Sequence, residues 1–277
     1  MKRLTALFTD HTEANLAFIL HMAKEEAYEL QGLFLRHLKP TPALQYPFAS
    51  DLSLTQTPVI EVITGQEDLT PAQHRLNRVQ QQCNAAGVPF SGTILPDASL
   101  DDLIFQTAFA DLLLLDAGLI LEEYVISPLN VSLQDALIRS HCPVLVVPTG
   151  AAQPQKTILA YDAHHSTLFA IRMYTYLLAQ NSRRPTQLVT VNRPDNPDQQ
   201  PADSLQHWLQ QRFSHLDTVA LRGKVREELV QFIQQQSEPV LVVMSAYGGD
   251  ALSRLFHESI ASTVLKQTRA MLFITHQ

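Results

Sequence analysis

The chain has 277 residues, of which 45% are hydrophobic and 17% charged, and its formal net charge is -7. This length suits one large core or two domain-sized cores, and the negative charge argues against nucleic-acid binding, which needs clustered Lys and Arg. The two cysteines are too few for a disulfide framework or a four-cysteine zinc site, so we expect a cytoplasmic protein. We find no secretory signal and no membrane-spanning run, and therefore expect no membrane contact.

Apolar runs alternate with helical periodicity through the first half of the chain. The expected strands are Leu4–Phe8, Gln31–Leu38, Val88–Ile94, Asp111–Leu115 and Val144–Val147. Four helices are expected. The first covers Glu13–Ala27, the second runs from Thr70 to Gly87, the third starts around Ser99, and the fourth ends near Arg139. Strands that alternate with helices predict a parallel sheet covered on both faces.

A short polar linker, Gly150–Gln155, is followed by a second round of the same alternation. Its expected strands are Thr157–Tyr161, Gln187–Val191, Thr218–Leu221, Val240–Met244 and Met271–Ile274. Its expected helices are Thr167–Ala179, Ser204–His215, Val225–Gln235 and Glu258–Gln267. We therefore expect two domains of one fold, at residues 1–150 and 156–277.

Residue offsets favour duplication of one ancestral unit. Asp10 aligns with Asp162 (162 − 10 = 152) and Ala110 with Glu238 (238 − 110 = 128), while aligning Cys142 with Arg269 gives 127. The difference between the first two offsets, 24 residues (152 − 128), is assigned to an excursion at about 39–65, which is longer than the ~12 to 15 residues of an ordinary structureless loop. The excursion is apolar enough to be either a packed segment, which we favour, or a lid.

Two pairs of segments resemble the universal stress protein family. ADLLLLDAG at 110–118 with CPVLVVPTG at 142–150 is similar to the last two strands of that family, and VLVVMSAYGG at 240–249 followed by ESIASTVLKQ at 258–267 is more similar still. The resemblance extends to Gly223, which precedes the third helix of the second half. The resemblance implies two Rossmann-like or flavodoxin-like α/β domains, each a mostly parallel five-stranded sheet, paired within the chain as a pseudo-dimer. Pairing of Val144–Val147 with Met271–Ile274 would cover two apolar edge strands.

In ATP-binding members the resemblance implies a signature GxxG, nine residues, then Gly followed by Ser or Thr, whose last residues open a helix where N–H groups favour phosphate. The signature positions here are Ser245, Gly248, Glu258 and Ser259. Glu258 would repel phosphate by ~1 kcal/mol or more per charge. Its alternative role is that of a stabilising acidic residue in the first turn of a helix. We expect weak or lost binding of ATP or AMP.

The resemblance places the contacts with base and ribose on the first two strands of the second half. Asp162 is the strongest of these positions, and its alternative role is that of a turn residue at a strand end; Tyr161 is bulky enough to fill part of the adenine pocket. The full set of candidate nucleotide-binding residues is Ala160, Tyr161, Asp162, Val191, Ser245, Gly248, Gly249, Ser259 and Ile260. The first half has Asp116 and Asn130–Val131 at the phosphate positions, so no phosphate site is expected there.

Other candidate chemistry is sparse. His164 and His165 invite a metal-binding interpretation, but no acidic or cysteine partner stands at ligand spacing, and a solvated loop is favoured. Cys83 and Cys142 are expected in the core rather than as reactive thiols. No catalytic motif appears.

The favoured interpretation is a non-catalytic stress-response or regulatory protein that needs no cofactor and acts through an unidentified protein partner. Assembly of the chain into a homo-oligomer is a further expectation that the sequence leaves open. One alternative is an ATP-binding switch or slow ATPase that uses the second domain only. The other is a carrier of an apolar small ligand beneath the excursion.

Overall fold

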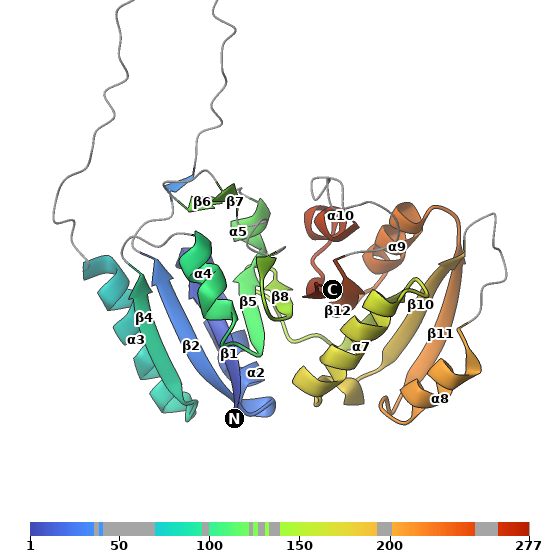
Figure 1. Cartoon of the computed structure of the whole chain (residues 1–277), viewed down its shortest axis with the longest axis horizontal. Helices are drawn as coiled ribbons and strands as arrows, with labels where there is room; N and C mark the ends of the chain where they lie inside the picture. The colour runs from blue at the N-terminus through green and yellow to red at the C-terminus, as the bar shows by residue number, and fades with distance from the viewer. Residues whose placement is uncertain are drawn as a thin grey trace, which may run out of the picture.

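The computed structural model describes residues 1–35, 39–40, 70–95, 100–121, 124–126, 131–132, 139–192, 201–246 and 260–276. Most of the excursion at about 39–65 therefore lies outside the described residues, as do Asn130, Gly248, Gly249, His257, Glu258 and Ser259. The chain places its two halves side by side, with the strands of both halves joined in one sheet (Figure 1).

Ten strands form this sheet in the order β11-β10-β9-β12-β13-β8-β5-β1-β2-β4. The first-half strands are β1 (Lys2–Phe8), β2 (Tyr28–Leu35), β4 (Phe90–Leu95), β5 (Leu112–Asp116) and β8 (Val144–Val147). The second-half strands are β9 (Lys156–Tyr161), β10 (Thr186–Asn192), β11 (Leu216–Arg222), β12 (Val240–Ser245) and β13 (Met271–Thr275). Within this ten-stranded sheet, all pairs inside each half are parallel, and both halves share one strand order, which confirms the predicted fold class.

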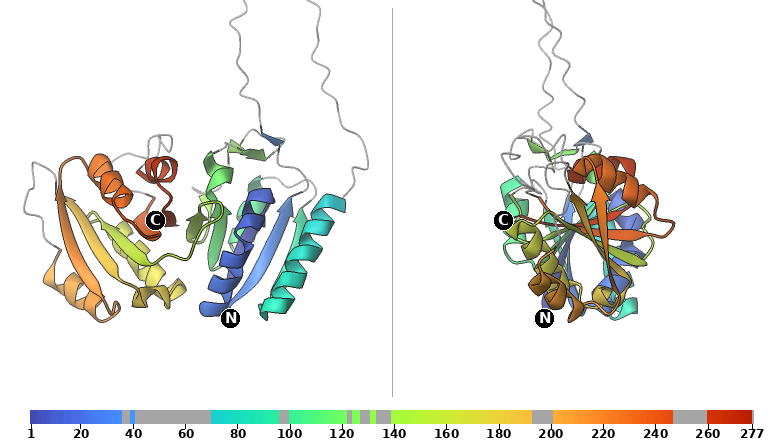
Figure 2. Two further views of the ribbon diagram at one scale, coloured as in Figure 1. Left: turned by 180° about the vertical axis from the view of Figure 1, so that it is seen from behind. Right: turned by 90° about the vertical axis from the view of Figure 1, so that its right-hand side faces the viewer.

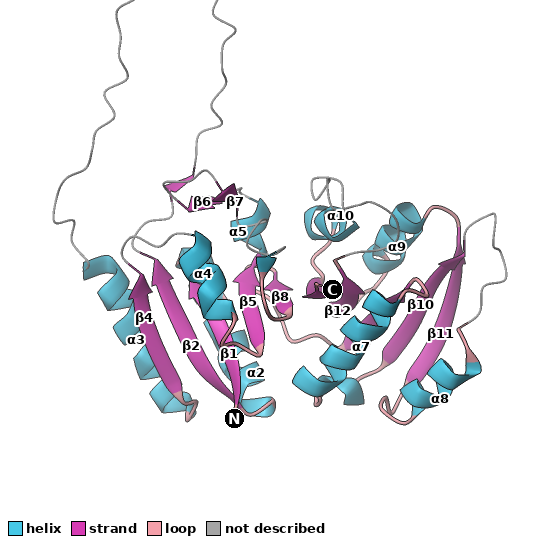
Figure 3. Cartoon of the chain, viewed as in Figure 1, coloured by secondary structure: helices cyan, strands magenta, loops and turns pink. Residues whose placement is uncertain are grey.

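Helices cover both faces of the sheet (Figures 2 and 3). The helices whose apolar side chains join one core cluster are α2 (Leu16–Glu25), α3 (Thr70–Ala86), α7 (His165–Leu177) and α8 (Asp203–Gln210). Those whose side chains join the other cluster are α4 (Leu100–Thr107), α5 (Ala117–Leu121), α9 (Val225–Gln234) and α10 (Ile260–Gln267). The helix α1 (Asp10–Ala14) and the 3-10 turn η1 (Asn181–Arg183) complete the helical elements described.

The two halves join through one antiparallel strand pair. Strand β8 pairs with β13, with Leu145 opposite Phe273, Val146 opposite Leu272 and Val144 opposite Ile274. All four residues of β8 and all five of β13 are buried. This confirms the expected pairing of the last strands, which leaves neither of these apolar strands as a free edge.

A buried carboxylate makes a second link between the halves. The Glu26 side chain is 1% exposed, and its Oε1 accepts hydrogen bonds from the backbone N–H groups of Gln180 (2.9 Å) and Asn181 (3.3 Å) and from Asn181 Nδ2 (3.1 Å). Lys2 Nζ lies 4.0 Å from Glu26 Oε2 and donates to the Leu177 carbonyl. The end of α7 is thus tied to the first half.

Burial raises the pKa of Glu26 above 4.5, against the opposing effects of Asn181 and Lys2. At pH values above 4.5 the Glu26 carboxyl group therefore holds its proton more tightly in the folded state than in the unfolded state. Its contribution to the free energy of unfolding falls as pH rises through this range. Glu26→Gln removes the titration, and we expect its free energy of unfolding, relative to wild type, to increase with pH across that range. Denaturant titrations at several pH values test this, with the exposed Glu227→Gln as control; parallel profiles for wild type and Glu26→Gln would contradict it.

Both halves have the same strand order, as the predicted duplication requires, but the predicted alignment is wrong by one residue. Ala6 pairs with Leu114 and Leu159 pairs with Val243, and all four face the same core cluster. The offsets are therefore odd, because an even offset would turn equivalent strand side chains to opposite faces. The strand ends set them at 153 (Tyr161 with Phe8) and 129 (Ser245 with Asp116), which also matches Leu159 with Ala6 and Val243 with Leu114. The net difference of 24 (153 − 129) is unchanged.

Some elements differ from the sequence-based expectation. The helix expected to reach His215 ends at Gln210, because the chain turns so that Phe213 is buried and its ring stacks near Tyr174, with centroids 6.3 Å apart. Three very short strands that were not predicted, β3 (Lys39–Pro40), β6 (Tyr124–Ile126) and β7 (Val131–Ser132), form a separate sheet in the first half.

Gly223 has a backbone conformation that side chains rarely adopt. Its φ is +144, and a Cβ there would lie 2.5 Å from Glu228 Oε1. Gly87 has φ +70 with no atom within 4 Å of a Cβ. We expect Gly223→Ala to cost about 2 kcal/mol or more of unfolding free energy and Gly87→Ala about 1 kcal/mol. Thermal or chemical unfolding of the two variants checks the order, and equal costs would contradict it.

Candidate functional site

The parallel strands β10, β9 and β12 lie side by side in the second half, so their carboxyl ends lie at one edge of the sheet, and α10 is the next described helix after β12. In open parallel sheets, ligands bind at this end of the strands. Ala160, Val191 and Ile260 are each partly buried and pack against the same core cluster, together with Ala246. Three of the predicted nucleotide-binding positions thus lie on the same side of the sheet, packed against one core cluster.

Asp162 follows β9 and is held by local hydrogen bonds. Its Oδ1 accepts from the backbone N–H of His164 (3.0 Å) and from Thr167 Oγ1 (2.7 Å), while His164 Nδ1 lies 3.4 Å from Oδ2. With this side chain 32% exposed, the arrangement is an Asx turn that leads into α7. The turn-residue role considered for Asp162 is therefore present in the structure.

Tyr161 does not share the face of Ala160. Its ring packs against the core cluster beneath α7 and α8, whereas Ala160 joins the opposite cluster, because successive strand residues point to opposite faces. Tyr161 therefore faces away from Ala160, and its place in an adenine pocket stays a prediction. Burial, with a smaller contribution from Asp162, raises the pKa of Tyr161.

Ser245, the first signature position, ends β12 opposite Thr275 and is buried. The next backbone N–H, that of Ala246, donates to the Thr275 carbonyl at 2.8 Å. The remaining signature positions, Gly248, Glu258 and Ser259, and the neighbouring Gly249 lie outside the described residues. The geometry of a phosphate loop is thus a prediction from the sequence alone.

The first half holds a buried carboxylate at the equivalent of Ser245. With the offset of 129, that equivalent is Asp116 (245 − 129 = 116), whose side chain is fully buried. Asp116 accepts hydrogen bonds from Asn15 Nδ2 (2.7 Å), Thr149 Oγ1 (2.8 Å) and the backbone N–H of Gly118 (2.7 Å). An N–H group of the kind that a phosphate loop presents to a ligand is here bonded within the protein.

The same network extends to the linker between the halves. Asn15 Oδ1 accepts from the backbone N–H of Ala151 at 2.9 Å, so Asn15 connects the Asp116 carboxylate with the start of the linker. The sequence did not reveal this network, because its members are up to 136 positions apart.

The alignment also changes the counterpart of Asp162. The offset of 153 gives Thr9 (162 − 153 = 9) rather than Asp10. Thr9 Oγ1 lies 3.3 Å from Thr12 Oγ1, in the way that Asp162 contacts Thr167. The identity of two aspartates after a strand produced the misalignment.

In the part of the chain that the structure describes, the histidines and cysteines form no candidate metal site. Across the described ranges, no group of three or more His, Cys, Asp or Glu side chains could hold a metal ion. Both cysteines are buried and free, and burial raises the pKa of each thiol to about 11, which favours a core role. Among the described helices, none is long and apolar enough to cross a membrane.

Comparison with solved structures shows which known fold this chain has. A universal stress protein from Archaeoglobus fulgidus DSM 4304 is similar over 99% of this chain and 98% of its own, with a TM-score of 0.64 and 9% identity. This chain has the universal stress protein fold, present twice. A Pseudomonas aeruginosa PAO1 protein described as functionally unknown is similar over 100% of this chain and 92% of its own (TM-score 0.58, 12% identity).

A further structure, from Pseudomonas aeruginosa UCBPP-PA14, carries a provisional universal stress protein assignment and has a TM-score of 0.58 at 14% identity, over 100% of this chain and 93% of its own. No family model and no curated protein sequence matches the chain. The likeness to these three structures is one of fold, over 92% to 98% of their chains.

Proposed function

We propose that the chain is a cytoplasmic universal stress protein whose domains, residues 1–150 and 156–277, have diverged so that adenine nucleotide can bind only to the second, and weakly. The observation that carries this proposal is the buried Asp116 network. A carboxylate at the first signature position of the first half repels phosphate and bonds to a backbone N–H of its loop.

The second half has no such carboxylate at the equivalent position, where Ser245 stands. Its apolar side chains Ala160, Val191 and Ile260 lie on one side of the sheet, and apolar side chains of this kind line sites that receive a base. The candidate phosphate contacts remain Ser245, Gly248, Gly249 and Ser259, with Glu258 as the residue that weakens them.

With one weak site and no catalytic motif, we propose a stress-response or regulatory role by binding rather than by catalysis, through a protein partner or a further copy of the chain. Hydrolysis of ATP in the second half is the alternative from another class. The apolar-carrier hypothesis concerns the excursion at about 39–65, most of which lies outside the described residues.

A calorimetric titration with ATP tests the nucleotide proposal. Wild type is expected to bind at most one ATP, weakly, and Glu258→Gly to tighten binding roughly tenfold by restoring an anion site at the helix start. The control is Glu238→Gly, which removes an exposed carboxylate elsewhere in the same half. Tight wild-type binding, two sites per chain, or equal affinity for Glu258→Gly and wild type would each contradict the proposal.

A further inference from the structure

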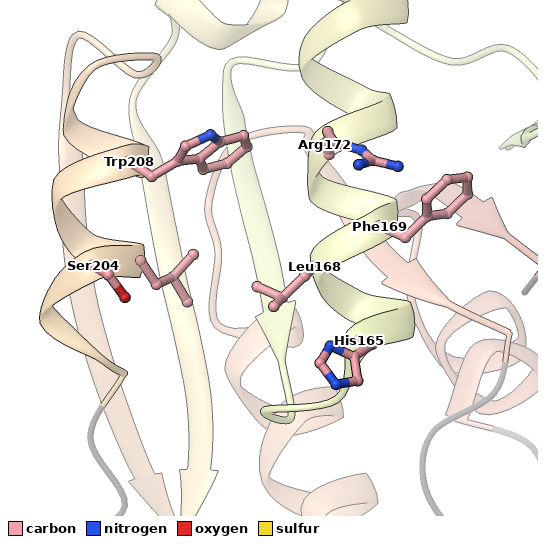
Figure 4. A pocket seen from close by; sticks show the side chains of 7 residues that line it. His165, Leu168, Phe169, Arg172, Ser204 and Trp208 are labelled. Atoms are coloured by element: carbon pink, nitrogen blue, oxygen red, sulfur yellow. The ribbon is translucent and has the colours of Figure 1, made fainter.

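A groove lies between α7 and α8, on the outer side of the helix layer. This open groove has a volume of about 520 Å³, and it is lined by His165, Leu168, Phe169 and Arg172 of α7 and by Ser204, Leu205 and Trp208 of α8. The α7 residues are spaced i, i+3, i+4 and i+7, so they share one face of the helix. Figure 4 shows Trp208 pointing toward α7 and Leu168 pointing back toward α8. A volume of this size is typical of small-molecule sites.

The first half closes the equivalent surface with an ion-pair cluster. Glu13 bonds to Arg75 (3.1 Å) and Arg78 (2.8 Å) of α3. The buried residues Leu16, Ile19 and Met22 match Ile171, Tyr174 and Leu177 at an offset of 155 (171 − 16), which makes Leu168 the counterpart of Glu13.

On the second helix, β4 begins at Phe90 and β11 at Leu216, an offset of 126 (216 − 90). The fully buried Cys83 and Leu209 match at the same offset. Ser204 is therefore the counterpart of Arg78 (204 − 126 = 78). Because Leu168 and Ser204 cannot form an ion pair, the duplicated helix pair stays open where the first half is bridged.

Each wall of the groove carries an aromatic ring with an arginine over it. The Arg172 guanidinium carbon lies 5.2 Å from the Phe169 ring centroid, and that of Arg212 lies 4.0 Å from the Trp208 ring centroid. None of the seven lining residues is acidic; Asp203, which begins α8, is not among them. Within the described residues, no carboxylate pairs with Arg172, so its charge is available to an anion.

We propose that this groove binds an aromatic carboxylate, with the ring against Trp208 and Leu168 and the carboxylate on Arg172. Stacking on an aromatic platform and a charge-assisted hydrogen bond together select a ligand that is both planar and anionic. The groove lies on the side of the sheet covered by α7 and α8, whereas Ala160, Val191 and Ile260 pack with the opposite cluster. It is therefore a second site, independent of the proposed nucleotide site.

Trp208 is the only tryptophan in the chain, so its fluorescence reports on this groove. We expect para-nitrobenzoate to quench this fluorescence saturably. The neutral para-nitrobenzyl alcohol should need an about tenfold higher concentration for the same quenching. Arg172→Gln should weaken para-nitrobenzoate about tenfold, while Arg183→Gln, which removes an exposed arginine of the same half, should leave the affinity unchanged.

Leu168→Glu supplies a second variant, since it places in the groove the residue type that the first half has at Glu13. It should abolish saturable quenching while the circular dichroism of the chain stays that of wild type. Quenching that does not saturate, equal affinity for the acid and the alcohol, or wild-type affinity in both Arg172→Gln and Leu168→Glu would overturn the proposal. Displacement of para-nitrobenzoate by ATP would overturn the independence of the two sites.

Discussion

Leu145→Asp is expected to lower the free energy of unfolding by more than about 4 kcal/mol, because it buries an unpaired charge. Leu145 is fully buried and stands opposite Phe273 in the pair that joins the halves. Phe273 in turn packs edge-on against Tyr174, with ring centroids 5.7 Å apart. A carboxylate at this point removes the reason for β8 and β13 to pair.

Separation of β8 from β13 would expose two apolar edge strands, so we expect the remaining folded protein to associate in a concentration-dependent way. Denaturant unfolding and sedimentation of the variant measure the two effects. The control is Ala220→Asp, which puts the same charge at an exposed position of the outer strand β11 and should change stability by less than about 1 kcal/mol. A stable, monomeric Leu145→Asp chain would contradict the role given to this strand pair.

Asp116→Ala is expected to cost about 3 kcal/mol of unfolding free energy, since it removes the acceptor of three hydrogen bonds in a buried site. Asp116→Asn keeps one acceptor oxygen and should cost less. The matched control is Asp101→Ala, because Asp101 is 73% exposed and pairs only across the surface with Arg139; its loss should change stability by about 0.5 kcal/mol or less.

Nucleotide affinity should not change in Asp116→Ala, because the first half has Asn130–Val131 rather than Gly-Ser at the later signature position. ATP calorimetry on the variant checks this independently of its stability. Equal unfolding energies for Asp116→Ala and Asp101→Ala would contradict the structural role of the network, and a new ATP site would show that Asp116 alone had blocked one.

The regular part of the fold could be predicted from local pattern. Apolar runs such as Leu112 to Leu115 and the proline-led start of α3 carry their own signals, and the alternation of strand and helix predicts the parallel order. The pairing of β8 with β13 was implied by the resemblance to the universal stress protein family, and the need to cover two apolar edges supported it. The strands and helices themselves depend on neighbours in sequence or on the repeat.

Long-range geometry could not be predicted in the same way. The one-residue error in the repeat arose because Asp10 and Asp162 are identical residues after a strand, whereas the face on which Ala6 and Leu159 lie becomes known only when the sheet is packed. The groove follows from Leu168 and Ser204 facing each other where Glu13 and Arg78 bond in the first half. Neither Leu168 nor Ser204 carries a sequence signal of binding.

The asymmetry between the halves is tested most directly by photolabelling the intact chain with an azido-adenine analogue of ATP and mapping the labelled peptides, with excess ATP as competitor. We predict that competable label falls only in the second half, in peptides that contain Ala160 to Asp162 or Ser245 to Ala246. Competable label in first-half peptides at the ends of β1 and β5, in amounts comparable to the second half, would contradict the account.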